Sequence, residues 1–116
     1  MLLSTKDRQI LEHIIEYCRE VQLGLMEFHS DKTLFMQNAV FRNACAMPIM
    51  QIGELSKKLS DDIQDTHREI PWRAIKGMRD IFAHDYHSMN KDMIWETATN
   101  NIPALSVELE KILKEE

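Results

Sequence analysis

The scarcity of glycine and proline constrains the fold of this sequence more than any other feature. The 116 residues contain three of each, which leaves little of the turn chemistry that closely spaced strands need. Apolar residues instead recur every three or four positions, the spacing that places them on one face of a helix. The sequence therefore predicts an all-α fold, and its length suits one domain over residues 1–116.

The first half of the chain predicts two long helices. The first begins at Ser4, a residue suited to cap a helix, and carries the Asp7 carboxylate three positions later. The second carries apolar residues in steps of four and three between Phe41 and Leu59. Pro48 lies inside it and should kink it, because proline removes one backbone hydrogen bond.

The second half predicts two further helices after a loop over residues 60–67. One begins near Pro71 and extends to Phe82, and the other begins after Asn90. Pro103 either kinks this last helix or divides it into two. The sequence thus predicts a four- to five-helix up-down bundle with nearly antiparallel packing.

Cysteine usage and charge limit the classes of function. Cys18 and Cys45 lie in apolar helical patterns without metal-ligand spacing, so we expect reduced, buried thiols in a cytoplasmic protein. No signal peptide or membrane span is predicted. A net charge of −5 argues against a protein that coats nucleic acid. The one net-positive segment, residues 67–91, favours a local site for a phosphodiester or nucleotide.

That segment contains the residues with the clearest chemistry. Arg79 can grip phosphate oxygens in a bidentate manner, and His84 can exchange a proton near neutral pH. Tyr86 adds a hydroxyl. Taken singly, Arg79 would more often pair with Asp80 or with an acid on a neighbouring helix, and His84 would cap a helix end.

The spacing of the motif carries a further inference. Residues 79 and 84 are about 140° apart around a straight helix, so one helix cannot easily direct both side chains at one atom. Either the helix ends near Ala83 and His84 turns back, or a second copy of the chain completes the site. A two-fold axis would also bring two imidazoles together, which RNA cleavage by 2′-hydroxyl attack can use as base and acid.

These residues resemble a known family. The pattern is Arg79, four residues, His84, one residue and Tyr86. It is preceded by residues 70–73 (Ile-Pro-Trp-Arg) and 77–78 (Gly-Met), and followed by residues 94–96 (Ile-Trp-Glu). With residues 52–55 (Ile-Gly-Glu-Leu) upstream, the similarity covers most of the chain. The sequence is similar to the HepT-like ribonuclease toxins of the HEPN superfamily.

The resemblance implies a HEPN-like bundle that forms a homodimer along the motif helix and cuts RNA without a metal or other cofactor. It implies that Arg79 binds the scissile phosphate, His84 transfers protons and Asp80 orients one of them. The implied partner is a minimal nucleotidyltransferase antitoxin that transfers AMP to Tyr86. Adenylation there would add bulk and negative charge beside the cleft.

Two alternatives remain open. The chain could be a non-catalytic nucleotide-binding subunit of a minimal nucleotidyltransferase, although such a module does not need a titratable group at His84. A metal could instead lie between His84, Asp85 and His87, which supply at most three ligands. Glu54, on an apolar face, is expected to be a buried carboxylate bonded to an arginine of the motif helix or of a second chain.

Overall fold

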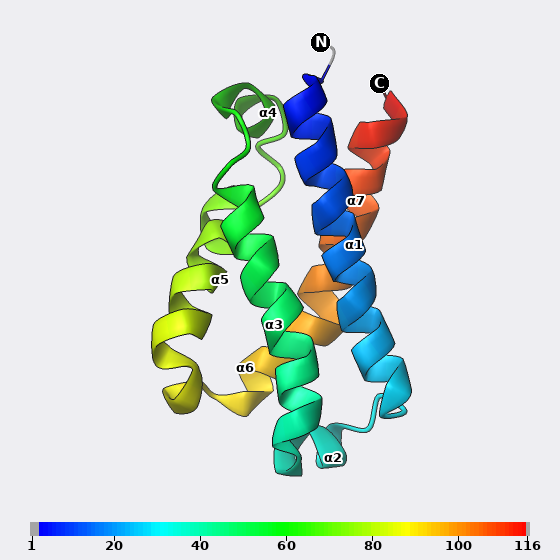
Figure 1. Ribbon diagram of the computed structural model, residues 1–116, viewed down its shortest axis with the longest axis vertical. Helices are drawn as coiled ribbons and strands as arrows, with labels where there is room; N and C mark the ends of the chain where they lie inside the picture. Colours follow the sequence, from blue (N-terminus) through cyan, green and yellow to red (C-terminus); the bar gives the residue numbers. More distant parts are fainter. Residues whose placement is uncertain (1–2, 116) are drawn as a thin grey trace.

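The computed structural model describes residues 3–115 of the chain, and this part is almost entirely helical. Short helices connect four long ones, and the termini lie at the same end of the molecule (Figure 1). The helices are α1 (Thr5–Glu27), α2 (Lys32–Gln37), α3 (Ala39–Ser56), α4 (Asp61–Thr66), α5 (Trp72–Asp85), α6 (Lys91–Glu96) and α7 (Ile102–Glu115), with a 3₁₀ turn (Tyr86–Ser88) and a π-helical turn (Thr97–Asn101).

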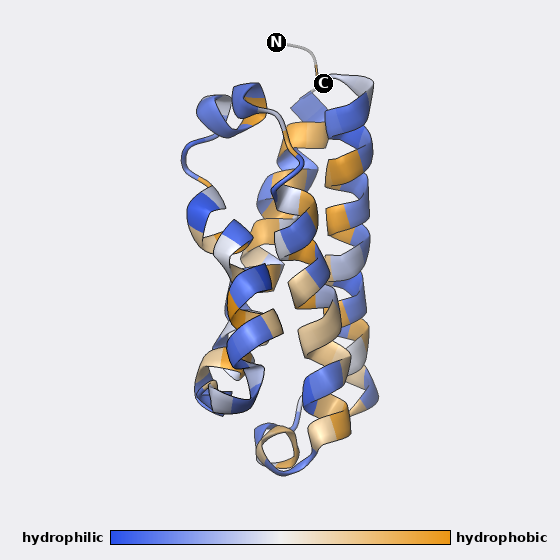
Figure 2. Ribbon diagram, turned by 60° about the vertical axis from the view of Figure 1, so that its left-hand side comes forward, coloured by the Kyte–Doolittle hydropathy of each residue, from blue (hydrophilic) through white to orange (hydrophobic). Residues whose placement is uncertain are grey.

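The long helices pack in the order α5, α3, α1, α7. Helix α3 lies between α5 and α1, and α7 packs against α1 (Figure 1). Hydrophobic residues form bands along the helices (Figure 2), as packing of amphipathic helices requires. The predicted all-α bundle is confirmed. None of the helices in the described part of the chain is long and apolar enough to cross a membrane.

The start of α1 is fixed by the predicted cap and by one contact that the sequence did not reveal. The Ser4 hydroxyl accepts a hydrogen bond from the Asp7 amide at 3.0 Å, as expected. The buried Asp7 carboxylate accepts from the amide and the hydroxyl of Ser60, at 3.0 and 2.5 Å. Ser60 in turn caps α4. The loop expected over residues 60–67 is therefore wrong, because a capped helical turn forms there.

The two prolines have different surroundings. Helix α3 continues without interruption through Pro48 and ends at Ser56, three residues before the expected Leu59. The last predicted helix is not divided, because α6, the π-helical turn and α7 follow one another without a break, and Pro103 lies just after the π-helical turn. Proline has no amide hydrogen to donate, and the preceding amide of Ile102 donates to the Thr97 carbonyl five residues back, which is the wider bonding of a π-helical turn.

Helices α3 and α5 approach most closely at Gly53. A Cβ atom at this position would lie 2.7 Å from the Arg79 amide nitrogen and 2.9 Å from the Ile75 carbonyl oxygen. Real side chains do not tolerate such distances, so only glycine permits this spacing. The close approach fixes the segment of α5 that carries Arg79 against α3.

Candidate active site

The Arg79 side chain extends from the middle of α5 towards α3. Its Nε lies 3.1 Å from Oε2 of Glu54, and its Nη1 lies 3.3 Å from Oδ1 of Asp80. The same Asp80 oxygen lies 3.2 Å from Nζ of Lys57. The hydrogen bond and charge of Lys57, and to a smaller extent those of Arg79, hold the pKa of the Asp80 carboxyl below its usual value. Four alternating charges therefore form one chain along the seam between α3 and α5.

This arrangement leaves part of the Arg79 guanidinium available. A guanidinium carries five N–H donors on three nitrogens, and the two carboxylates engage Nε and Nη1. No partner of Nη2 is found within residues 3–115. The side chain is 38 % exposed, so an anion can reach this edge from solvent. Glu54 is partnered as predicted, but the expected burial is wrong because its side chain is 43 % exposed.

His84 lies in the last turn of the same helix. Helix α5 extends to Asp85, so the first option from the spacing, a helix that ends near Ala83, is wrong. Regular helix geometry then separates Arg79 and His84 by about 140° and about 7.5 Å along the axis. His84 is exposed, and no hydrogen bond or ion pair to it is found in the described part of the chain. Its imidazole is therefore free to act on a group outside this chain.

Tyr86 lies directly after α5, in the 3₁₀ turn, as its position past the helix end predicted. Its hydroxyl donates a hydrogen bond of 2.7 Å to Oδ1 of Asn43 on α3, and its ring stacks on Phe82 with centroids 6.1 Å apart. Burial raises the pKa of the Tyr86 phenol, while the nearby Arg42 guanidinium lowers it. The ring is partly buried and packs against the hydrophobic core.

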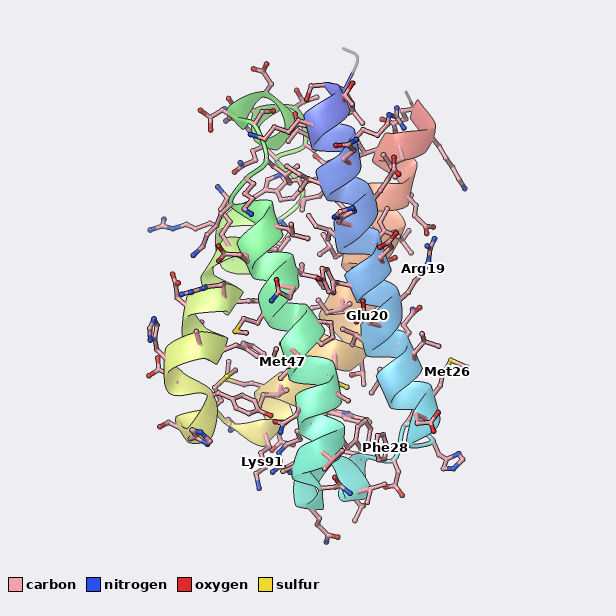
Figure 3. The ribbon with its side chains drawn as sticks, in the orientation of Figure 1. Arg19, Glu20, Met26, Phe28, Met47 and Lys91 are labelled. Atoms are coloured by element: carbon pink, nitrogen blue, oxygen red, sulfur yellow. The ribbon has the colours of Figure 1, made fainter. Side chains whose placement is uncertain are left out.

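The outward face of α5 is open. A Cβ added at Gly77 would have no neighbour within 4 Å, and Ile81, one turn later, is 46 % exposed. His84 follows three residues after Ile81 and shares this face. On α3, Met47 is also exposed (Figure 3). An open stripe that ends in His84 can accept another chain.

Neither the metal alternative nor the larger hollow beside α5 brings the motif residues together. No three histidine, cysteine or acidic side chains in residues 3–115 are placed to hold one ion, so His84, Asp85 and His87 do not form a cluster. A hollow of about 480 Å³ lies between α5 and α7 and is lined by residues such as Ile70, Met78 and Leu105. None of Arg79, His84 and Tyr86 lines it.

Sequence reasoning identified Arg79, His84, Asp80, Tyr86 and Glu54 but missed three of their neighbours. Asn43 and Arg42 meet Tyr86, and Lys57 meets Asp80. All three lie on or just after α3. These residues reach the motif only because of the register of α3 against α5. Gly53, where the two helices are closest, is the sequence feature that could have indicated this register.

The chain is an all-α bundle whose motif helix carries Arg79 on the seam with α3 and His84 at the end of its open face. Comparison with known proteins gives the family: the family model "Ribonuclease HepT-like" matches residues 8–112. The chain belongs to the HepT-like ribonuclease family.

Individual relatives agree with this assignment. The chain is similar to "Probable ribonuclease HepT" of Thermococcus cleftensis, with 37 % identity over 91 % of this chain and 88 % of the relative. It is also similar to a "Putative RNase" of Caldanaerobacter subterraneus subsp. tengcongensis, with 34 % identity over 94 % of this chain and 96 % of the relative. A "Putative RNase" of Methanocaldococcus jannaschii is 36 % identical over 70 % of this chain and 67 % of the relative. No solved structure gives a significant match.

Proposed function

We propose that the protein is a metal-independent endoribonuclease and the toxin of a toxin-antitoxin pair. The observation that carries this proposal is the state of the motif helix. Arg79 is held by Glu54 with one guanidinium edge open, and His84 is exposed on the same helix, with no partner among residues 3–115. A guanidinium that is positioned by a carboxylate can bind a phosphodiester, and a free imidazole can move a proton.

The site forms when two chains pair along α5. One chain alone supplies one imidazole per motif and separates it from Arg79, whereas a two-fold axis beside the open face of α5 supplies two of each. The exposed Ile81 and the small Gly77 on this face suit close contact between two copies of the helix. The partner of each chain is therefore a second copy.

The chemistry follows from two imidazoles and two guanidinium groups. One neutral His84 takes the proton of the ribose 2′-hydroxyl, and the resulting oxygen attacks the adjacent phosphorus. The bond from phosphorus to the 5′-oxygen breaks, and the protonated His84 of the second copy gives its proton to that leaving oxygen. Arg79 stabilises the negative charge that develops on the phosphoryl oxygens. The products are a 2′,3′-cyclic phosphate and a 5′-hydroxyl end.

We further infer that the activity is silenced by adenylation of Tyr86, carried out by a minimal nucleotidyltransferase antitoxin. The hydroxyl of Tyr86 lies beside Arg42, a cation that can hold the added phosphate. Because burial favours the neutral phenol, the partner must supply the base that takes the proton of the hydroxyl. The phenol oxygen then bonds to the α-phosphorus of ATP, and pyrophosphate leaves. The adenylate would then place negative charge where the RNA backbone has to bind.

Incubation of the purified protein with RNA in EDTA tests the activity. We expect cleavage that leaves 2′,3′-cyclic phosphate ends and that disappears in the His84→Ala variant, while circular dichroism shows an unchanged helical fold. Activity that EDTA removes and a transition metal restores would move the site to His84, Asp85 and His87. Nucleotide binding that persists in His84→Ala, without any cleavage by the wild-type protein, would favour the nucleotide-binding subunit instead.

A further inference from the structure

A second hollow lies between α3 and the 3₁₀ turn that follows α5. It is separate from the hollow between α5 and α7. Its cavity volume is about 340 Å³, within the range of about 300–1,000 Å³ seen for small-molecule sites. Its wall is formed by seven residues: Asn43, Ala46, Met47, Met50, Phe82, Tyr86 and His87. Tyr86, the tyrosine of the motif, thus forms part of the wall of this hollow.

The residues that line this hollow suit a flat, apolar ligand with polar edges. Phe82 and Tyr86 stack with an interplanar angle of 23°, and the His87 ring lies 5.9 Å from the Tyr86 ring. The thioethers of Met47 and Met50 complete the apolar part, and methionine adapts well to aromatic ligands. No carboxylate lines the hollow, so nothing in its wall repels an acceptor-rich ring.

The side-chain amide of Asn43 can form hydrogen bonds with the edge of such a ligand. The Tyr86 hydroxyl donates to Oδ1 of Asn43, so this bond engages the oxygen of the amide and not its nitrogen. The Nδ2 group then keeps both N–H donors, for which no partner is found in the part of the chain that the structure describes. These donors can reach a ring nitrogen or a carbonyl oxygen on the edge of a nucleobase.

The position of the hollow relative to Arg79 completes the argument. Helices α3 and α5 are antiparallel, and residues of the two helices face one another in three successive pairs. These pairs are Glu54 with Arg79, Met50 with Phe82, and Asn43 with Tyr86. Tyr86, in the turn directly after α5, is seven residues beyond Arg79, which is about 10 Å along a helix axis. This length is comparable to the span of one nucleotide from its phosphate to its base.

We propose that this hollow is a nucleobase site, which holds the base of a nucleotide whose phosphate is bound at Arg79. The inference rests on the proposed ribonuclease function. The base belongs to the RNA substrate, next to the cleaved bond. An adenine attached through Tyr86 has the same chemistry and would occupy the same hollow, so that adenylation would exclude the substrate base as well as its phosphate.

Methionine methyl groups provide a test that does not depend on cleavage. We would label the protein with ¹³C-methyl methionine, assign Met47 and Met50 by their Leu variants, and titrate with AMP, GMP, CMP or UMP. We expect saturable shifts of these two methyl signals with nucleotides and not with ribose 5-phosphate, which lacks the base. Met26, 69 % exposed on α1 at the opposite edge of the molecule (Figure 3), serves as the unshifted control. Equal shifts with ribose 5-phosphate, or none at millimolar nucleotide, would overturn the proposal.

A cleavage experiment then separates this proposal from the ribonuclease function. We expect Met47→Ala to lower cleavage of ordinary RNA about tenfold, the effect of losing one base contact. It should cause no further loss on RNA with an abasic site at the same nucleotide, and Met26→Ala should change neither. An equal loss of cleavage on both RNAs would overturn the proposed base site but would leave the proposed ribonuclease function intact. Nucleotide-dependent methyl shifts in a protein that cuts no RNA would support the base site and would contradict the proposed ribonuclease function.

The adenylated protein distinguishes the two sources of the base. If the appended adenosine occupies the hollow, the Met47 methyl signal of the modified protein should already lie at its nucleotide-bound position without added nucleotide. A signal at the free position that still responds to AMP would assign the hollow to the RNA base alone.

Discussion

The Nε atom of Arg79 and the Oε2 atom of Glu54 lie 3.1 Å apart and connect the motif helix to α3. The contact lies next to Gly53, where the two helix backbones are closest. An ion pair this exposed contributes little to stability, about 0–1 kcal/mol. Its consequence is geometric, because it decides which edge of the guanidinium remains open for a phosphate.

The first prediction concerns this pair. Glu54→Ala should lower kcat for RNA cleavage about tenfold with little change in KM, because Arg79 remains but loses its fixed orientation. Glu54→Gln, which keeps an acceptor, should retain most of the activity. Steady-state kinetics of both variants provide the measurement. An unchanged kcat in Glu54→Ala would show that the carboxylate does not position Arg79.

The second prediction concerns the close approach of α3 and α5. Gly53→Ala should destabilise the protein by about 2 kcal/mol, because its methyl group meets the backbone of α5 and not a flexible side chain. Gly24→Ala is the matched control, because a Cβ atom at Gly24 inside α1 would make only ordinary contacts of 3.6 Å, and it should stabilise the protein by about 0.5–1 kcal/mol. Urea denaturation of both variants measures the difference. Equal stability of the two variants would contradict the observed helix spacing.

The bundle could be predicted from the sequence because helical spacing and caps are local signals. Ser4 indicated the start of α1, and the stripe ending at Phe82 indicated α5. The α4 turn could not be predicted in the same way. Its stability depends on the contact between Asp7 and Ser60, which are 53 positions apart, and no local pattern reports such a contact.

The third prediction concerns the two cysteines. Burial raises the pKa of Cys18 to about 12 and that of Cys45 to about 11, so both thiols should resist alkylation at pH 8 in the folded protein. Unfolded thiols ionise near pH 8.5. The stability that burial provides is therefore fully present below that pH and is lost as the pH rises towards the folded values. Alkylation rates with and without urea measure this, and rapid labelling of the native protein would contradict the burial.

The fourth prediction concerns control by the partner. Tyr86→Phe keeps the ring that lines the hollow and loses only the bond to Asn43, so it should retain most RNA cleavage and growth inhibition. It should escape neutralisation by the nucleotidyltransferase, because no hydroxyl remains to receive AMP. Removing the bond to Asn43 should cost about 1 kcal/mol of stability. Intact mass of the wild-type chain after co-expression should show multiples of one adenylate. Neutralisation without added mass would mean that the partner blocks the site by occlusion.

The motif could be found in the sequence because its residues are close together along the chain, and the Glu54 partner could be guessed from one polar residue on an apolar face. Asn43 and Lys57 could not, because their roles depend on the register between α3 and α5. The sequence also left open how His84 is used. Its place within α5 is the reason why the proposed site takes the second imidazole from another copy of the chain.

The activity of a mixed dimer tests this central claim most directly. Wild-type and His84→Ala chains with different affinity tags would be co-expressed, and the heterodimer would be purified through both tags. If each site needs two imidazoles across a two-fold axis, the heterodimer should be as inactive as the His84→Ala homodimer. A heterodimer with about half the wild-type activity, as expected for two independent sites in a symmetric dimer, or a monomer that cleaves RNA, would contradict the account.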